Sequence, residues 1–250
     1  MPITNYDKSI SAPYPEIADI ETASDDYAAR FSGTVGDYFL RLQAKITLDL
    51  IKDLPRVSVL DIGGGHAQLA VPLAQNGYKV TVTGSNDICK KRLDNLLKDG
   101  SLSYKTCDSL HLPYENGQFD IVMAFRLLPH TRQWQKLIGE MCRVANKAVV
   151  LDYPDKRSTN VFYNVLFNLK KKAEGNTRTY FMFSRQMLSD EFAQNNFQRP
   201  SFHPEFFLPM VIHRKLKQPS FSQFFEAMFK IFFLTRTFGS PIILRSNKNK

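Results

Sequence analysis

The stretch VLDIGGGHAQLA, residues 59–70, restricts the possible folds more than any other part of the chain. An apolar run ends in Asp61, and three glycines follow almost at once. A buried parallel strand that turns into a helix uses glycines at such a turn, because the backbone bends sharply there and approaches a nucleotide closely. The stretch therefore predicts a nucleotide-binding strand–turn–helix unit in an α/β protein.

Strand-like and helix-like segments alternate at short spacing up to residue 154. The predicted strands are the apolar runs RVSVLDI, YKVTVTG, LSYKTCD, QFDIVMAF and KAVVLDY. Helical spacing of apolar residues occurs at 27–53, before Asn76-Gly77, at 87–100 and at 132–145. Pro72 is tolerable only near the first turn of its helix, which should therefore begin near Gln68. The alternation predicts a doubly wound, mostly parallel sheet with right-handed crossovers.

The chain changes character after Pro154, because 16 of its 20 phenylalanines lie in residues 151–250. Helices are predicted at 158–172 and at 184–196, the second with Ser184 as its N-cap. The run GSPIILRS predicts a last strand. The segment FFEAMFKIFFLTRTF is apolar nearly all round, which is typical of a buried helix or of one that lies at an interface with its basic residues toward anionic head groups.

A chain of 250 residues is long enough for one large α/β domain. We expect residues 1–26 to form a flexible arm and 27–250 a single domain. Within that domain, 27–53 would be a helix and lid, 56–154 the nucleotide-binding core, and 155–250 the helices that cover the substrate together with the last strands.

Composition limits the class of protein further. The formal net charge of +9, partly clustered, fits a solvated surface, an anionic substrate, an anionic membrane surface or nucleic acid. Cys89, Cys107 and Cys142 are far apart and form no C-x-x-C, so neither a disulfide framework nor a metal site is indicated, and a reducing, cytoplasmic setting is the default. The polar N-terminal stretch does not resemble a signal peptide, and no apolar run approaches the ~18 residues that span a bilayer.

The glycine turn must be matched to a ligand. A dinucleotide site uses G-x-G-x-x-G and an acid about 20 residues later. Here the third glycine is absent, and Gly84-Ser85 stands where the acid would be. No Gly-Lys-Ser/Thr follows, which excludes a Walker loop. S-adenosylmethionine fits better, because it carries no phosphate, its ammonium group suits Asp61, and its adenine amine suits an acceptor such as Asp108.

With these residues in view, the chain resembles the class I S-adenosylmethionine-dependent methyltransferases, and in particular their small-molecule methyltransferase-domain branch. The resemblance covers about residues 27–154. It rests on VLDIGGGHA (59–67), CDSLHLPYENGQFDIVMAF (107–125) and AVVLDYP (148–154), and GSPIILR is similar to the family's last, antiparallel strand. It implies a Rossmann-like sheet of seven strands and S-adenosylmethionine as cofactor.

The resemblance also implies the residues that bind the cofactor. The methionine end would lie against Asp61, Gly63, Gly64, Gly65 and His66, and the adenine against Asp108, Ser109 and Leu110. Phe125 would lie between cofactor and acceptor. Two positions depart from the family pattern, since Ala67 replaces the third glycine and no acid stands near Gly84 for the ribose. Ser85 or Asn86 would bind the ribose as neutral partners, or Asp87 would reach back.

Methyl transfer from a sulfonium is an in-line displacement in which the protein mainly aligns the reactants and excludes water. A base is needed only where the acceptor loses a proton. The candidate catalytic residues are His130, Arg126 and Tyr153, at the ends of the fourth and fifth strands, where open α/β sheets bind ligands. Arg126 would either bind an acidic group of the substrate or pair with Asp152. Tyr27 and Phe31 would close over the cofactor.

The Phe-rich C-terminal third favours a small, hydrophobic or lipid-linked acceptor and a peripheral contact with an anionic membrane surface. Nucleic acid fits less well: RLLPH follows the fourth strand, where methyltransferases of base amines use Asn/Asp-Pro-Pro-Tyr, although a tRNA or rRNA acceptor stays open. Two other functions also stay open. One is a methyltransferase-like binding protein without turnover, and the other is an NADP-dependent oxidoreductase.

Overall fold

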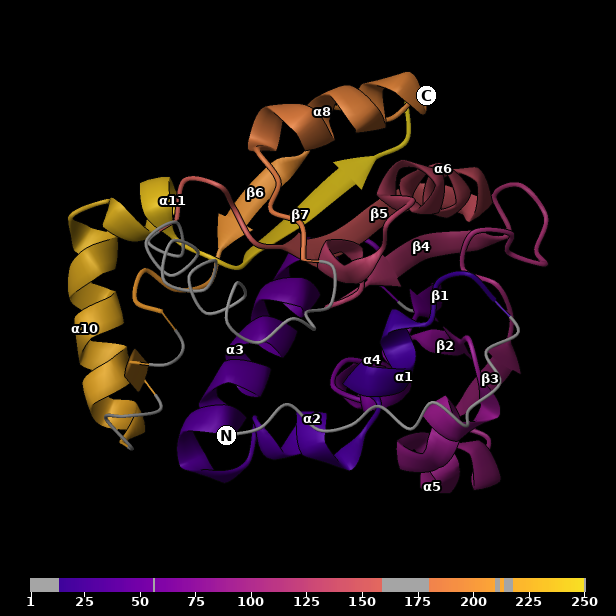
Figure 1. The fold of residues 1–250 in the computed structure, drawn as a ribbon, viewed down its shortest axis with the longest axis horizontal. Coiled ribbons are helices and arrows are strands. Elements are labelled where there is room, and N and C mark those ends of the chain that lie inside the picture. Colours follow the sequence, from indigo (N-terminus) through magenta and orange to yellow (C-terminus); the bar gives the residue numbers. More distant parts are fainter. Residues whose placement is uncertain (1–13, 56, 159–179, 210–211, 214–217, 250) are drawn as a thin grey trace, which may run out of the picture.

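The computed structural model describes residues 14–55, 57–158, 180–209, 212–213 and 218–249. Its centre is a seven-stranded sheet in the order β3-β2-β1-β4-β5-β7-β6 (Figure 1). Strands β1 to β5 pair in parallel, and β7 runs antiparallel to β5 and β6. The doubly wound, mostly parallel fold predicted from the sequence is thereby confirmed. The strands are β1 (Ser58–Ile62), β2 (Lys79–Gly84), β3 (Leu102–Thr106), β4 (Phe119–Ala124), β5 (Ala145–Tyr153), β6 (Ser201–Pro204) and β7 (Ile242–Asn247).

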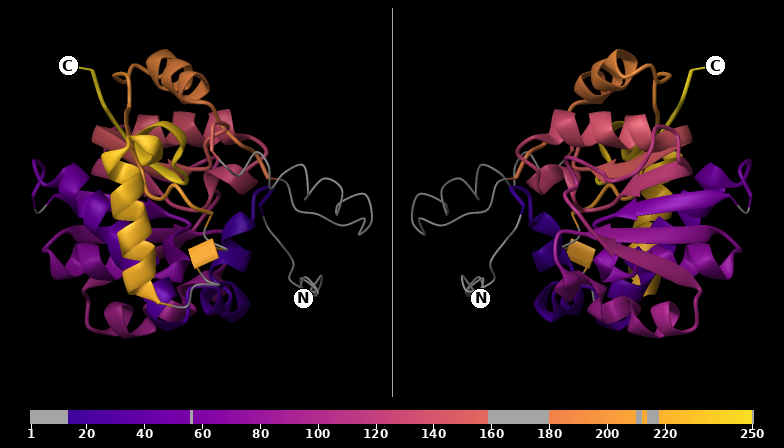
Figure 2. Two further views of the ribbon diagram at one scale, coloured as in Figure 1. Left: turned by 90° about the vertical axis from the view of Figure 1, so that its left-hand side faces the viewer. Right: turned by 90° about the vertical axis from the view of Figure 1, so that its right-hand side faces the viewer.

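Helices flank the sheet (Figure 2). They are α1 (Ala18–Thr22), α2 (Asp25–Ala29), α3 (Gly33–Ile51), α4 (Ala70–Gln75), α5 (Asp94–Lys98), α6 (Trp134–Val144), α8 (Arg185–Gln194), α10 (Pro219–Ile231) and α11 (Leu234–Phe238), with 3-10 turns η1 (Gly64–His66), η2 (Asp87–Leu93) and η3 (Leu128–His130). The helix expected over 27–53 is interrupted at Ser32, and the one expected over 87–100 begins as a 3-10 helix. Ser184 caps α8 by accepting a hydrogen bond from the Met187 amide at 3.2 Å. The helix expected at 158–172 falls almost wholly outside the described residues.

Both faces of the sheet are buried, because successive side chains of a strand alternate between them. On one face, apolar residues of β1 and β4 such as Leu60 and Val122 pack with α6 and α8. On the other face, residues such as Val59 and Ile121 pack with α3 and α4. This double layer explains why the parallel strands are apolar without interruption.

Residues 1–26 are predicted from the sequence to form a flexible arm, but the part of this segment that includes α1 packs against the domain. Helix α1 lies against η1, and Asp19, Ile20 and Thr22 on it are buried. Ile20 and Ala23 form a small apolar cluster with Cys89, and this burial holds the segment in place. Residues 1–13 of the arm are outside the described part of the chain.

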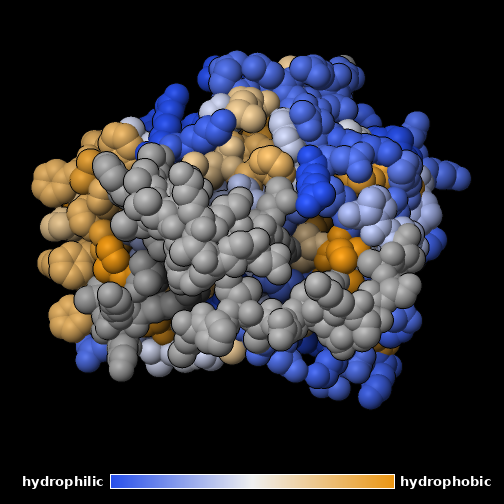
Figure 3. Space-filling view, in the orientation of Figure 1, coloured by the Kyte–Doolittle hydropathy of each residue, from blue (hydrophilic) through white to orange (hydrophobic). Residues whose placement is uncertain are grey.

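Helices α10 and α11 lie at the edge of the molecule, on the side of β6 and β7 (Figure 1). Large apolar side chains gather on this side of the surface (Figure 3). Among the described residues, no helix is both long and apolar enough to cross a bilayer.

Candidate cofactor and acceptor site

The glycine turn lies at the carboxyl end of β1. Gly63 has a left-handed backbone with φ 71°, which only glycine adopts without strain. The Asp61 carboxylate lies directly beneath Gly64, where a Cβ would be 2.2 Å from Oδ2. Asp61 is 2% exposed, and burial raises the pKa of its carboxyl to about 7. A ligand with a positively charged group would favour the ionised form of this carboxyl.

Two small cavities lie next to the turn, and each has room for about one water molecule. The first cavity is lined by Thr22, Asp61, Gly63, Gly64, His66, Gln68, Leu69, Phe125 and Arg126. The second cavity is lined by Asp19, Ile62, Gly63, Thr83, Gly84, Ser85, Cys107, Ser109 and Leu127. Each cavity is bordered by a residue of α1, and both share Gly63. Because each cavity is too small for a ligand larger than water, neighbouring residues must shift before such a ligand binds, and α1 borders both cavities.

Polar atoms without partners gather at the first cavity. Both ring nitrogens of His66, Oε1 of Gln68 and Nη1 of Arg126 are buried and have no hydrogen-bond partner among the described residues. Buried polar atoms are nearly always hydrogen-bonded in folded proteins. Four such atoms around one cavity therefore indicate a binding site for a polar ligand.

Aromatic side chains cover His66. The rings of Tyr27 and Phe31 lie edge-on to its imidazole, with centroids 5.6 Å away in both cases. Burial, followed by the positive charge of Arg126, lowers the pKa of His66 to about 4. His66 is therefore neutral at physiological pH, so it can offer one donor and one acceptor to a ligand.

Arg126, just past β4, is held by several contacts at once. Its backbone has φ 58°, which costs a non-glycine residue about 1 kcal/mol. Its amide donates to Asp152 Oδ1 at 2.6 Å and its Nη2 to Gln43 Oε1 at 3.2 Å. Its guanidinium carbon lies 3.8 Å from the centroid of the Phe31 ring. Strained residues that persist in this way concentrate at functional sites.

A buried pair of carboxyls stands behind Arg126. Nε2 of Gln43 donates to Asp152 Oδ2 at 3.4 Å and to Glu205 Oε1 at 3.2 Å. Burial raises the pKa of Asp152 to about 6. Burial and then the nearby Asp152 raise the pKa of Glu205 to about 8. At neutral pH the cluster thus holds one negative charge beside the Arg126 guanidinium.

The core of the chain, residues 60–151, matches a family model described as a methyltransferase domain. This core matches the family that the sequence motifs resemble, the class I S-adenosylmethionine-dependent methyltransferases. The family's cofactor is S-adenosylmethionine, which confirms the cofactor predicted from the sequence. An ammonium group beside Asp61 and polar atoms beside His66 and Gln68 suit the methionine end of this molecule, so the residues present fit it.

Individual relatives share parts of the chain. The ubiquinone/menaquinone biosynthesis C-methyltransferase UbiE of Ralstonia nicotianae is 31% identical over 155 residues, which cover 56% of this chain and 63% of that protein. Norajmaline N-methyltransferase of Rauvolfia serpentina is 31% identical over 104 residues, covering 38% of this chain and 36% of that protein. The chain therefore spans less than two thirds of these curated relatives.

A solved structure shares the fold over nearly the whole chain. Magnesium protoporphyrin IX methyltransferase of Synechocystis PCC 6803, crystallised with bound SAH, has a TM-score of 0.60 and 16% identity, and the match covers 92% of this chain and 97% of that one. At such identity the likeness concerns the fold alone.

The residues predicted for adenosine binding are only partly brought together. Ser85 and Ser109 line the second cavity. The Asp108 carboxylate contacts its own loop, accepting from the Leu110 amide at 2.9 Å and meeting His111 Nδ1 at 2.9 Å, and Leu110 is fully buried. Asn86 caps η2 by accepting from the Ile88 amide at 3.0 Å.

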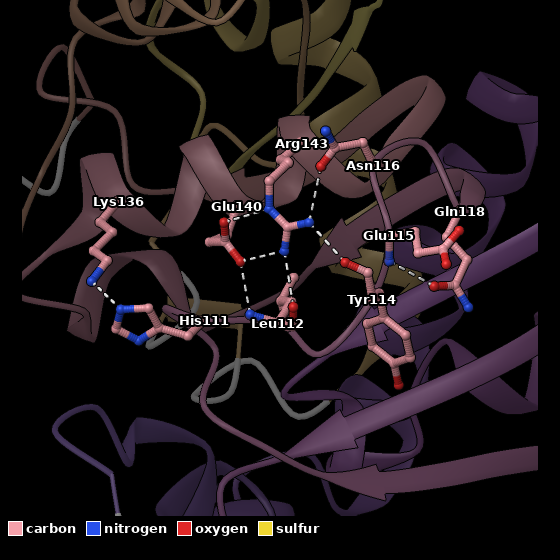
Figure 4. Close-up of polar contacts among 9 residues, drawn as sticks. All are labelled: His111, Leu112, Tyr114, Glu115, Asn116, Gln118, Lys136, Glu140 and Arg143. Carbon is pink, nitrogen blue, oxygen red and sulfur yellow. Dashed lines mark hydrogen bonds and ion pairs between the residues drawn. The ribbon is translucent and has the colours of Figure 1, made fainter.

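The loop that carries Asp108 is fixed to α6 by hydrogen bonds from its backbone to the side chains of Arg143 and Glu140 (Figure 4). The Arg143 guanidinium donates to the carbonyls of Leu112 and Tyr114 at 2.9 and 2.7 Å. It also pairs with Glu140 at 2.7 Å, and Glu140 accepts from the Leu112 amide at 2.7 Å. These contacts, here called the Arg143–Glu140 bracket, hold the loop beside the second cavity.

Of the three predicted catalytic residues, Arg126 lines the first cavity. His130 ends η3, and its ring lies 5.6 Å from the ring of Tyr180. Tyr153 is fully buried and packs edge-on to Phe183 and Phe202. The structure brings neither His130 nor Tyr153 to either cavity.

Sequence reasoning missed Gln43 and Glu205. Gln43 did carry a signal, because it shares the buried face of α3 with Phe39 and Thr47 at spacings of four residues. A polar side chain on such an apolar stripe needs a buried partner. Glu205 follows a short edge strand and gave no comparable signal.

Proposed function

We propose that this chain transfers a methyl group from S-adenosylmethionine to a small hydrophobic or lipid-linked acceptor. The observation that carries the proposal is the first cavity, where the buried Asp61 carboxyl lies close to unpartnered polar atoms of His66, Gln68 and Arg126. The bacterial relative is a C-methyltransferase of ubiquinone and menaquinone biosynthesis. We infer an acceptor of similar chemistry, a hydroxylated ring that carries an apolar chain.

The residues of the site divide the work between them. When bound, S-adenosylmethionine supplies a methyl group on a positively charged sulfur. Asp61 would accept hydrogen bonds from the ammonium group, and the backbone of the glycine turn would lie along the methionine end. Cys107 and Ser109 would border the adenosine in the second cavity. Tyr27 and Phe31 would exclude water from the reacting atoms.

Arg126 is the residue we assign to the acceptor. Methylation of a hydroxylated ring is faster when a ring oxygen bears negative charge, and a fixed cation stabilises that charge. Nη1 of Arg126 has no hydrogen-bond partner among the described residues, and Arg126 lines the first cavity. Asp152 and Gln43 hold the rest of this side chain and its backbone. These contacts favour an orienting and charge-stabilising role over general-base catalysis.

The surface of α10 and α11 supports an acceptor that resides in a membrane. Its exposed apolar side chains, here called the phenylalanine face, are Phe221, Phe224, Ile231, Phe232, Phe233 and Phe238. Lys230 and Arg236 are exposed among them. The one acid in these two helices, Glu226, is 2% exposed and turns inward to accept from the Phe207 and Leu208 amides at 2.9 Å. An apolar face with only positive charges suits an anionic lipid surface.

The proposal is tested with S-adenosylmethionine labelled in its methyl group. Purified protein would be incubated with a prenylated quinol that lacks a ring methyl group, and in parallel with bacterial lipid extract. We expect the unchanged protein to transfer label to the organic phase. The Arg126→Gln variant should do so with a kcat/KM that is at least 100-fold lower. Asp26→Asn, an exposed acid on α2, serves as the matched control with unchanged rate.

Two other outcomes would replace the proposal. Binding of S-adenosylmethionine with no label transferred to any lipid or water-soluble acceptor would favour a binding protein without turnover. Binding of NADPH in preference to S-adenosylmethionine would favour an oxidoreductase.

A further inference from the structure

Strand β2 ends without the carboxylate that sheets of this kind use to bind a ribose. Gly84, its last residue, has no room for any side chain. A Cβ there would lie 2.3 Å from the Tyr104 hydroxyl oxygen, which donates to the Asn86 carbonyl at 2.8 Å. An acid at this position would therefore displace Tyr104.

The polar residues that follow Gly84 are engaged elsewhere. Asn86 Oδ1 caps η2. The Asp87 carboxylate is exposed, bonds to the Thr106 hydroxyl and pairs with Lys90 at 2.9 Å. Asp87 thus does not reach back toward the cavity, as one of the sequence hypotheses required. Neither residue lines the second cavity.

Another carboxylate stands at this place. Asp19 of α1 is 4% exposed and lines the second cavity with Gly84, Cys107 and Ser109. Its Oδ2 accepts from the Ser85 amide at 2.5 Å and its Oδ1 from the Ser85 hydroxyl at 2.6 Å. Its Oδ2 also lies 3.2 Å from the point where a Gly84 Cβ would be. The charge missing from β2 is thus present, on a segment that lies 65 residues earlier in the chain.

We propose that Asp19 is the ribose-binding carboxylate of this methyltransferase, supplied by α1 in place of β2. This inference rests on the proposed S-adenosylmethionine site. Each carboxylate oxygen has two acceptor positions. The Ser85 contacts use one position on each oxygen, and the Cys89 thiol donates to the second position of Oδ2 at 3.6 Å. The open position of Oδ1 binds one ribose hydroxyl, and the other hydroxyl replaces the Cys89 thiol on Oδ2, once α1 has moved outward to admit the nucleoside. When α1 returns to its observed position, Asp19 contacts the ribose, so cofactor binding is coupled to the closure of α1.

The test is calorimetric titration with S-adenosylhomocysteine and with its 2′,3′-dideoxyribose analogue. For S-adenosylhomocysteine, Asp19→Asn is expected to weaken binding at least tenfold. The dideoxy analogue lacks the ribose hydroxyls, so the Asp19→Asn variant and the unchanged protein should bind it with equal affinity. Asp26→Asn is the control for charge, and thermal melting checks that each variant is folded.

The outcomes separate the inference from the proposed function. Equal weakening toward both ligands would make Asp19 structural and overturn the inference. Tighter binding by Asp19→Asn would show that Asp19 competes with the ribose, which also overturns it. A larger loss in Asn86→Ala, confined to the ligand with hydroxyls, would assign the role to Asn86 instead. Failure of the unchanged protein to bind S-adenosylhomocysteine would remove the proposed function itself.

Discussion

Ala67, directly after the glycine turn, has a left-handed backbone with φ 64°. It occupies the place of the third glycine in the family pattern. An L-residue loses roughly 1 kcal/mol in this conformation because its Cβ approaches the following carbonyl. This departure from the family pattern is therefore also a source of strain next to the glycine turn.

Ala67→Gly should raise the free energy of unfolding by about 1 kcal/mol, since the strain outweighs the greater chain entropy of glycine in the unfolded state. Urea denaturation measures the change. Ala74→Gly in α4, at a right-handed helical position, is the matched control and should lower the free energy by about 0.5–1 kcal/mol. A loss of stability in both variants would contradict the expectation.

Glu205 makes stability depend on pH. Its pKa is raised from 4.5 to about 8, so between these values the folded state keeps a proton that the unfolded state has released. Stability from this group is full below pH 4.5 and is lost as the pH rises through about 8. The melting temperature of Glu205→Gln, measured relative to that of the unchanged protein, should therefore increase as the pH rises from 5 to 9. A difference that is constant across this range would mean that Glu205 does not titrate there.

Sequence reasoning reaches those site residues whose spacing is local. Asp61 and the glycines are recognisable because they form one continuous motif, and the same is true of the loop around Asp108. Asp19 and Glu205 come to the site through tertiary packing of α1 and of the segment after β6, and nothing beside them in the sequence indicates it. Local spacing predicts a ribose-binding acid near Gly84, because spacing contains no information on a distant segment such as α1.

The loop between β3 and β4 depends on α6 through the Arg143–Glu140 bracket. Arg143 reaches two backbone carbonyls and one carboxylate because its guanidinium is a planar fork, whereas lysine presents a single point charge. Backbone carbonyls at 2.9 and 2.7 Å lose their partner when the fork is removed. Ser109 lies three residues before Leu112 in this loop and lines the second cavity, so we expect its position to depend on these contacts.

Arg143→Lys should lower the free energy of unfolding by about 1–2 kcal/mol. It should also weaken S-adenosylhomocysteine binding several-fold, as urea denaturation and calorimetry would measure. Arg41→Lys on α3, where the side chain makes a single exposed contact with the Asp37 carbonyl, is expected to change stability by less than about 0.5 kcal/mol. Equal effects at the two positions would show that the bracket does not hold the loop.

Elements with strong periodicity were predictable and short ones were not. The five parallel strands and α6 follow their apolar patterns closely. Pro72 falls in the first turn of α4, as its missing amide requires. The edge strand β6 escaped prediction, because its four residues SFHP contain a proline and are stabilised mainly by pairing with β7.

At the scale of the whole molecule, the phenylalanine face leaves a broad apolar surface on one side (Figure 3). Exposed fractions reach 73% at Ile231 and 66% at Phe232. A surface this apolar marks an interaction site. It shares the molecule with a net charge of +9, which adds attraction to anionic lipids.

Phe224→Ser combined with Phe232→Ser should reduce binding to vesicles that contain anionic phospholipid at least tenfold in a flotation assay. Ile88→Ser is the control, because Ile88 is 52% exposed on η2, outside the phenylalanine face. Raising the salt concentration should weaken binding of the unchanged protein, since screening acts on the basic residues. Unchanged flotation of the double variant, or a shift to dimers in the unchanged protein alone, would assign this face to another partner.

The place of β7 in the sheet has a consequence for synthesis. This strand lies between β5 and β6, although the ribosome makes it after both. Arg245 on it also contacts Asp53 and the Leu50 carbonyl at the end of α3. Until its residues emerge, β5 has an open hydrogen-bonding edge, which is the type of edge that recruits other strands. The growing chain is therefore most exposed to aggregation when its cofactor-binding half is already complete.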